Sequence, residues 1–323
     1  MRYVFGPVPS RRLGLSLGID VIPFKTCSFD CIYCQLGRTT CKTIQRMSFA
    51  GPEEVVANLK LVLPRVKASY ITLSGSGEPT LSLDLDRLVR EIKELTPIPV
   101  AVLTNSSLLC RPEVRTALLD ADLVVPSLDA ASQEVFERTN RPHPELKTDD
   151  IIDGIRAFSS DFHGKLWIEV MLVKGVNDDE AELARISSVL RGIRAEKIQL
   201  NTVERPPAEP YVRPLSGEEM QRARCYFDER AEVIHAPGDG QARGGSALDV
   251  DEGGDEGGDM KAKYAQILGL LERRPCTLAD VANGLGLNMN EASKLLGMLL
   301  SLGLIRADSS TGGKAYFHRS RGD

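Results

Sequence analysis

The sequence predicts an α/β fold, an open (β/α)6 barrel, followed by a small unit of another class. Apolar runs rich in β-branched residues alternate with amphipathic helical patterns from the start of the chain to about residue 232. Several runs, such as residues 98–103, are apolar throughout, which is typical of strands in a parallel sheet covered by helices. Strand–helix units in series predict a barrel whose functional groups gather at the carboxyl ends of the strands.

The expected elements follow in order along the chain. Pro52 and Pro112 each stand in a first helical turn, which is a position that proline favours. We expect strands at Leu17–Ile22, Tyr70–Ser74, Ile98–Thr104, Asp122–Leu128, Leu166–Leu172 and Glu196–Asn201. We expect helices at Pro52–Leu63, Leu83–Leu95, Pro112–Leu119, Ser132–Arg138, Asp149–Ser159, Asp178–Arg191 and Gly217–Glu229.

The chain divides into three expected segments: a barrel over 1–235, a linker over 236–259 and a compact unit over 260–323. The linker is rich in Gly and Asp and has almost no apolar content, so it is expected to be flexible. In the last segment Thr277 and Asn288 are expected to cap two helices that follow a first one. A hairpin around 311–313 completes a pattern typical of a winged helix-turn-helix.

Composition limits the class of protein. The chain has 323 residues with 42% hydrophobic and 26% charged content, and it contains no apolar run of about 18 residues. Its N-terminal residues lack the long apolar stretch of a secretory signal. We therefore expect a cytoplasmic protein without a membrane partner, whose seven cysteines act as ligands or bystanders and not as a disulfide framework. The net charge of −5 does not favour nucleic acid over the molecule as a whole.

Three cysteines lie close together after the first expected strand. Cys27, Cys31 and Cys34 have the spacing C-x3-C-x2-C. Thiolates on one short loop can hold three irons of a cubane cluster and leave the fourth iron open. Zinc is the main alternative, but zinc sites usually show two cysteine pairs or a pair with histidines. Only Cys41, in a polar run, is available nearby as a fourth ligand, so an iron–sulfur cluster is favoured.

A second motif follows the next strand. It reads Gly75-Ser76-Gly77-Glu78-Pro79. Its glycines allow backbone groups to approach a ligand closely, and Glu78 offers an acceptor for an ammonium group. Taken alone, this loop is equally well explained as a tight turn. Together with the cysteine loop one strand earlier, it indicates a ligand site.

These motifs resemble the signature of the radical S-adenosylmethionine (SAM) superfamily over about residues 1–232. Tyr33 stands where that family places an aromatic residue near the adenine. The loop at 75–79 is similar to the G-G-E-P loop that holds the methionine amino group, with Ser76 replacing one glycine. Segments 6–14, 74–80, 125–129 and 172–178 resemble the Fe–S oxidoreductases related to the wyosine tRNA-modifying synthase.

The resemblance implies a partial TIM-like radical SAM barrel with two cofactors, a [4Fe-4S] cluster and S-adenosylmethionine. It also implies that the open iron chelates SAM, and that a 5′-deoxyadenosyl radical abstracts hydrogen from an unidentified substrate, RNA-linked or peptide. A reductant such as a ferredoxin or flavodoxin would supply the electron. Cys225 and Cys276 are isolated, so a second cluster is not expected.

Polar residues at the other strand ends are further candidates. Ser127 and Asp129 share one side of their strand and are expected to bind the ribose hydroxyls, although Asp129 could equally cap the next helix. Asn105, after Thr104, is expected to contact the cofactor. Lys174 is interpreted either as a partner of the SAM carboxylate or as a solvated lysine.

Residues placed around these ends are candidates for the substrate side. Glu169 needs a partner if it is buried. Arg11 and Arg12 are interpreted as ligands of an anionic substrate or as anchors of the N-terminus. The remaining candidates are Asn201, Glu204-Arg205 and Asn140-Arg141-Pro142-His143.

The C-terminal unit leaves a second function open, an iron–sulfur regulator that binds DNA through its winged helix. The expected recognition helix, 288–302, carries only Lys294 as a base, whereas major-groove readers usually present Arg, Asn or Gln. Nucleic acid is kept as a partner of this unit, but contact with protein or delivery of substrate is favoured.

Overall fold

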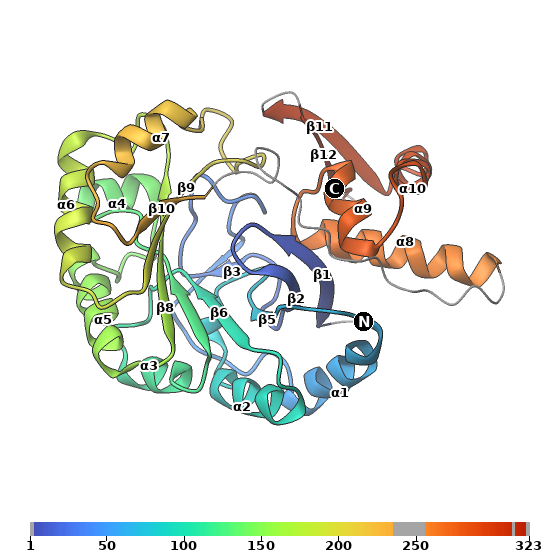
Figure 1. The fold of residues 1–323 in the computed structure, drawn as a ribbon, viewed down its shortest axis with the longest axis horizontal. Coiled ribbons are helices and arrows are strands. Elements are labelled where there is room, and N and C mark those ends of the chain that lie inside the picture. The colour runs from blue at the N-terminus through green and yellow to red at the C-terminus, as the bar shows by residue number, and fades with distance from the viewer. Residues whose placement is uncertain (1–2, 235–255, 312–313, 321–323) are drawn as a thin grey trace.

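The computed structural model describes residues 3–234, 256–311 and 314–320. Its main body is an eight-stranded curved sheet in the order β1-β2-β5-β6-β7-β8-β9-β10 (Figure 1). Neighbouring strands are parallel except β1, which is antiparallel to β2. The strands are β1 (Val4–Ser10), β2 (Gly14–Ile19), β5 (Tyr70–Leu73), β6 (Val100–Thr104), β7 (Leu123–Pro126), β8 (Lys165–Leu172), β9 (Lys197–Thr202) and β10 (Ala231–Val233).

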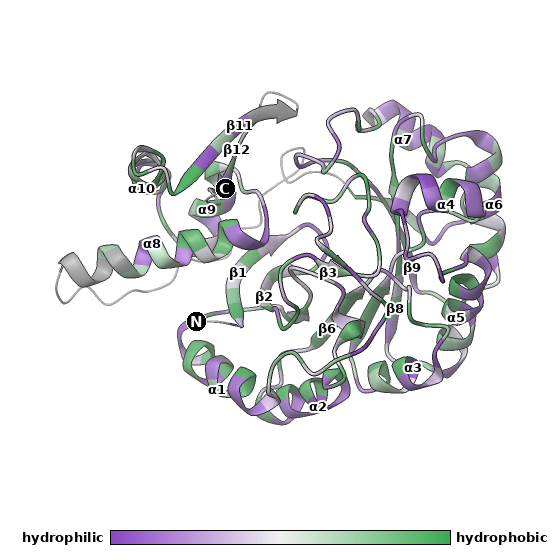
Figure 2. Ribbon diagram, turned by 180° about the vertical axis from the view of Figure 1, so that it is seen from behind, coloured by the Kyte–Doolittle hydropathy of each residue, from purple (hydrophilic) through white to green (hydrophobic). Residues whose placement is uncertain are grey.

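Helices cover the outer face of the sheet, as expected for βα units in series (Figure 1). Ribbons coloured by hydropathy show that each helix carries both polar and apolar stretches (Figure 2). The α-helices are α1 (Pro52–Val62), α2 (Leu85–Leu95), α3 (Pro112–Leu118), α4 (Gln133–Asn140), α5 (Thr148–Asp161), α6 (Glu180–Arg191) and α7 (Gly217–Arg224). The predicted class, a mixed α/β fold with a partial TIM-like barrel, is confirmed.

Two edge strands were not predicted. β1 contains Pro7 and Pro9, which argue against a strand unless it lies at a sheet edge, as β1 does. β10 has only three residues, and the helix before it ends at Arg224, earlier than the expected Glu229. Residues 225–230, between the end of α7 and the start of β10, turn the chain so that β10 can pair with β9.

The main core lies between the sheet and the helices and is built from the apolar runs of the strands. A smaller cluster fills the inner face of the barrel, where Leu13 packs with Leu123, Val125 and Trp167. Leu13 belongs to the turn between β1 and β2, so this turn closes the barrel near the amino ends of its strands.

The C-terminal unit consists of α8 (Glu256–Arg273), α9 (Leu278–Leu285), α10 (Met289–Ser301) and a hairpin of β11 (Ile305–Thr311) with β12 (Lys314–Arg319). It packs beside β1 (Figure 1), and Val8 shares a hydrophobic core with Ile267 and Leu270. The predicted caps Thr277 and Asn288 are present.

The boundary of this unit differs from the expected one. α8 begins at Glu256, four residues before the expected start at residue 260. Gly257 and Gly258 are poor helix formers, and for that reason this turn was not predicted. Residues 236–255 of the expected linker lie outside the described residues. Among the residues that are described, no helix combines the length and the apolar content needed to cross a bilayer.

Candidate cofactor site

The three cysteines of the first motif lie on the segment between β2 and α1. A short parallel pair, β3 (Thr26–Cys27) with β4 (Cys41–Lys42), begins this segment. The end of α4 holds it in place, because the amide of Ile32 donates to Thr139 O at 3.0 Å and that of Asp30 to Asn140 O at 3.0 Å. The candidate segment 140–143 is therefore brought to the cysteine loop. All seven cysteines of the chain are free thiols.

Each of the three thiols contacts a nitrogen donor from a different part of the chain. Lys25 Nζ lies 3.1 Å from Cys34 Sγ. Asn105 Nδ2 lies 3.4 Å from Cys27 Sγ, and Asn140 Nδ2 lies 3.5 Å from Cys31 Sγ. Donors of this kind stabilise negative charge on sulfur and tune the potential of an iron–sulfur cluster. Lys25 was not predicted, although its place two residues before Cys27 was a signal that could have found it.

Burial changes the pKa of two of these thiols. Burial and then the negative charge of Glu78 raise the pKa of Cys27 to about 12. Burial also raises the pKa of Cys31. A metal ligand must lose its proton, so metal binding here is coupled to proton release.

The three cysteines bear on the choice between a cluster and a single metal ion. Within the described part of the chain, no three His, Cys, Asp or Glu side chains converge on one metal position. A cubane spreads its three thiolates over three irons, so it does not need such convergence. The preference for a cluster over zinc stays a prediction from the spacing of the cysteines.

The glycine loop is joined directly to the cysteine loop. The amide of Lys25 donates to Ser76 O at 2.7 Å, and the amide of Glu78 donates to Thr26 O at 3.2 Å. A Cβ on Gly77 would lie 2.0 Å from Thr26 O, so only glycine permits this approach. Backbone hydrogen bonds and close packing thus join the two motifs into one structural unit.

Glu78 is buried and held by four donors. Its Oε1 accepts from the amide of Thr80 at 3.0 Å and from the hydroxyls of Thr80 and Thr104, both at 2.6 Å. Its Oε2 accepts from the amide of Asn105 at 2.7 Å. Burial raises the pKa of this carboxyl. Oε2 has one donor where a carboxylate oxygen can accept two, so it retains a lone pair for an ammonium group.

Ser76, which replaces a glycine of the resembled motif, has its own buried partner. Its hydroxyl donates to Asp20 Oδ2 at 2.6 Å and its amide to Asp20 Oδ1 at 3.1 Å. Arg273 Nε, at the end of α8, lies 3.3 Å from Asp20 Oδ2. Gly75 has φ +139° and leaves no space for a Cβ beside Asp20. The C-terminal unit therefore reaches the glycine loop through one carboxylate.

Asp129 is buried at the end of β7. It accepts from the Tyr33 hydroxyl, from Asn140 Nδ2 at 2.7 Å and from the amide of Met171 at 2.9 Å. Burial raises its pKa to about 6 despite these donors. Ser127 lies nearby, and with Asn105, Asp129 and Asn140 it lines a small cavity.

The substrate-side candidates form ion pairs across the open barrel. Arg12 Nη1 lies 3.0 Å from Glu169 Oε1, which also accepts from Asn201 Nδ2 at 3.0 Å. Arg11 Nη1 lies 2.5 Å from Glu204 Oε1. Both arginines thus connect the β1–β2 turn to the strands on the other side of the barrel. Their interpretation as anchors is supported by these pairs.

Lys174 does not lie with the other candidates. Its ammonium is 2.7 Å from Glu219 Oε1 of α7, and half of its side chain is exposed. Gly175, with φ +72°, turns the chain immediately after it. In this structure Lys174 therefore pairs with α7, and its contact with a SAM carboxylate stays a prediction.

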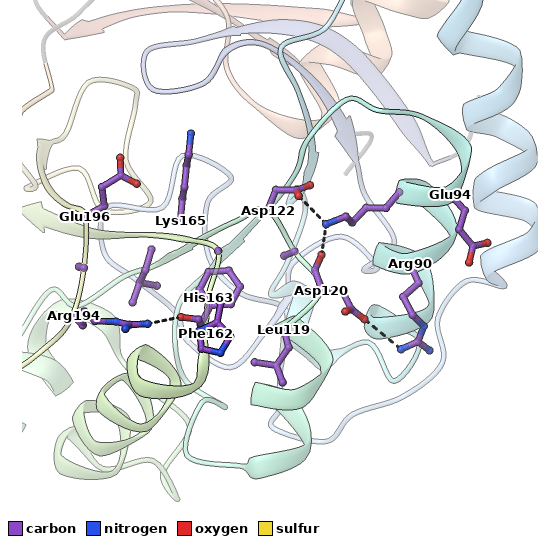
Figure 3. Close-up of a pocket in the computed structure, with 15 residues that line it drawn as sticks. Arg90, Glu94, Leu119, Asp120, Asp122, Phe162, His163, Lys165, Arg194 and Glu196 are labelled. Carbon is purple, nitrogen blue, oxygen red and sulfur yellow. Dashed lines mark hydrogen bonds and ion pairs between the residues drawn. The ribbon is translucent and has the colours of Figure 1, made fainter.

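A wide hollow lies away from both motifs. It has a volume of about 1110 Å³ and lies at the amino ends of β7, β8 and β9 (Figure 3). Two ion pairs lie in its lining, Lys93 with Asp122 at 2.7 Å and Arg90 with Asp120 at 3.7 Å. The polar groups of both motifs lie at the opposite, carboxyl ends of the strands.

Comparisons with known proteins agree with this geometry. The profile of the radical SAM superfamily matches residues 21–186. UPF0026 protein MJ1312 of Methanocaldococcus jannaschii is 39% identical over 232 residues, 71% of this chain and 72% of that protein. A protein named GTPase Obg from Brachyspira hyodysenteriae is 38% identical over 316 residues, 97% of this chain, and the chain spans only 45% of that relative's length.

The fold has a matching solved structure. A radical SAM methyltransferase from Sphaerobacter thermophilus superposes with a TM-score of 0.54 at 18% identity, over 69% of this chain and 67% of that one. Membership of this enzyme family brings with it a [4Fe-4S] cluster and SAM as cofactors. The predicted resemblance to the radical SAM superfamily is confirmed, and the chain belongs to that superfamily.

Proposed function

We propose that Cys27, Cys31 and Cys34 hold the cluster, and that the loop at 75–79 binds the methionine part of SAM. The observation that carries this proposal is that each thiol has its own nitrogen donor, on a loop joined by backbone hydrogen bonds to Gly75–Pro79. When bound, the cofactors supply an electron and a 5′-deoxyadenosyl radical that takes a hydrogen atom from the substrate.

The protein's own groups position these cofactors. Glu78 Oε2 accepts from the amino group of SAM, while Oε1 remains bound by the two threonine hydroxyls. Tyr33, Asn105, Ser127 and Asp129 face the adenosine part. Apolar side chains such as Phe29 and Ile32, both buried, exclude water around the thiols.

The substrate side is proposed more broadly. The substrate is RNA-linked or peptide, and a ferredoxin- or flavodoxin-like reductant supplies the electron. We place the reaction in the cytoplasm, where thiols stay reduced. The division of the chain into a barrel, a linker and a C-terminal unit is part of the same proposal, with the C-terminal unit beginning at α8, that is at Glu256.

Anaerobic reconstitution with iron and sulfide tests the assignment. Protein with a full cluster, mixed with SAM and dithionite, is expected to release 5′-deoxyadenosine, measured by chromatography. Cys31→Ala is expected to lose cluster iron and all release, whereas Cys225→Ala, an exposed cysteine on α7's end, is expected to retain both. Release no greater than that of buffer, from protein with a full cluster, contradicts the proposal.

A further inference from the structure

Three arginines meet where the open edge of the barrel faces the C-terminal unit. Arg11 belongs to the β1–β2 turn, Arg205 follows β9 and Arg274 follows α8. Tyr316 of β12 joins the two parts here, since its hydroxyl donates to Glu204 O at 2.7 Å. We call Arg205 and Arg274 the arginine cluster, and Arg11 lies beside it, held by Glu204.

Two of these side chains carry donors without partners. Arg274 is only 9% exposed, and its Nε and Nη2 have no hydrogen-bond acceptor among the described residues. Nε of Arg205 also has no hydrogen-bond acceptor among the described residues. The hydrogen bond of Arg205 that is seen runs from Nη1 to Gln35 Oε1 at 3.0 Å, and this acceptor is neutral.

Positive charge exceeds negative charge at this place. Glu204 is paired with Arg11 at 2.5 Å. Asp280 is a second carboxylate near this place, and its charge raises the pKa of Arg205. It accepts hydrogen bonds from the amide and the hydroxyl of Thr277, both at 3.0 Å. Burial lowers the pKa of Arg205, and the positive charge of Arg274 lowers it further.

Burying a cation without a counter-charge is unfavourable. Two adjacent guanidinium groups with free N–H donors are suited to oxyanions such as phosphate. The cluster also adjoins the cofactor loop, because Gln35 directly follows Cys34. Arg11, beside the cluster, keeps 18% of its side chain exposed.

We infer that the arginine cluster binds a phosphate group of the substrate and holds that substrate beside the cysteine loop. This inference rests on the proposed function and deepens it by naming the class of substrate as phosphate-bearing. The phosphate can belong to a free nucleotide or to an RNA chain, and the chemistry of recognition is the same for both.

Binding to the full, cluster-loaded chain tests the inference. The probes are inorganic pyrophosphate, a nucleoside triphosphate and a short single-stranded RNA, titrated calorimetrically at constant ionic strength. Arg274→Gln and Arg205→Gln are each expected to weaken binding about tenfold or more. Arg306→Gln, an exposed arginine on β11 of the same unit, is the matched control and is expected to bind as the parent does.

Each result decides the question. Arginine-dependent binding of the triphosphate identifies a free nucleotide, and arginine-dependent binding of RNA alone identifies an RNA-linked phosphate. Equal binding by Arg274→Gln and the parent, or an equal loss in Arg306→Gln, overturns the inference. So does a failure of all three probes to bind.

A second measurement is independent of the cofactors. Without added anion, Arg274→Met is expected to raise the melting temperature, because it removes an uncompensated buried charge. Pyrophosphate is expected to stabilise the parent but not this variant. Release of 5′-deoxyadenosine is measured separately, so failure of the cofactor assignment is distinguishable from failure of the phosphate site.

Discussion

At the scale of single residues, the geometry of the site depends on how closely two backbone segments approach each other, more than on unusual side chains. Gly77 brings the glycine loop so near to Thr26 that a Cβ would lie 2.0 Å from the carbonyl oxygen. Lys25, Asn105 and Asn140 then each place one donor on one thiol. The geometry of both cofactor loops is therefore sensitive to changes of a single carbon atom.

Gly77→Ala tests this sensitivity. The added methyl group must displace backbone, so unfolding is expected to become easier by about 3 kcal/mol and SAM binding to weaken. Gly217→Ala is the matched control, since nothing lies within 4 Å of its Cβ position and it begins α7. Urea unfolding measures the stability of both variants, and equilibrium dialysis with the loaded protein measures their SAM binding. Equal stabilities of the two variants would contradict the argument.

Lys174 has a testable electrostatic role at the surface. Its hydrogen bond, with that of the Ser216 amide, lowers the pKa of Glu219 to about 2. Because this pKa lies below the ordinary value of 4.5, the stabilisation is present above about pH 4.5 and is lost as the pH falls through about 2.

Lys174→Met is expected to raise the pKa of Glu219 toward 4.5, measured by NMR titration of its carboxyl carbon. The difference in stability between variant and parent is expected to vanish at the acid end of that range. Lys60→Met, an exposed lysine on α1, serves as the control and is expected to leave Glu219 unchanged. An unaltered Glu219 in Lys174→Met would refute the assignment.

At the scale of elements, α8 is the connection between the C-terminal unit and the cofactor loop. Its last residue, Arg273, pairs with Asp20, and Asp20 holds Ser76 by two hydrogen bonds. Arg273 also lies over the ring of Phe5, 4.9 Å from its centroid. One helix end therefore contacts both β1 and the carboxylate that supports the loop.

Arg273→Gln is expected to cost about 3 kcal/mol of stability, because Asp20 remains buried without its cation. It is also expected to weaken SAM binding through movement of Ser76, measured by equilibrium dialysis with the loaded protein. Arg273→Lys keeps the charge and is expected to recover part of both effects. Unchanged SAM affinity in a folded Arg273→Gln protein would separate α8 from the cofactor site.

At the scale of the whole molecule, the barrel and the C-terminal unit share a hydrophobic core. Val8 of β1 packs with Ile267, Leu270 and Leu271 of α8. The main core of the barrel does not include these residues. The unit is thus docked on the edge strand, which covers backbone and side chains that an open barrel would expose.

Calorimetry tests this docking. The two parts are expected to unfold in one transition, and Val8→Ala is expected to lower stability by about 1–2 kcal/mol. Hydrogen exchange in this variant is expected to increase first in α8 and α9, the helices beside β1. Two separate transitions, with the lower one unaffected by Val8→Ala, would show that the unit is only tethered.

The sequence by itself determined the parallel sheet, the helix series and the radical SAM resemblance of the two motifs, because their signals are local. Apolar runs, caps and cysteine spacing act within a few residues, so no knowledge of distant contacts is needed. It also predicted the caps Thr277 and Asn288 for the same reason.

Only the tertiary structure decided which residues serve those motifs from a distance. Asn140 lies 109 positions from the thiol it contacts, and Arg273 reaches Asp20 from another part of the chain. Lys174 is the opposite case. Its place at the end of a strand suggested a role in the cofactor site, whereas its ammonium group pairs with Glu219 of α7. Hydrogen bonds and ion pairs act over a few ångströms of space, and spacing along the chain does not reveal which groups folding brings that close.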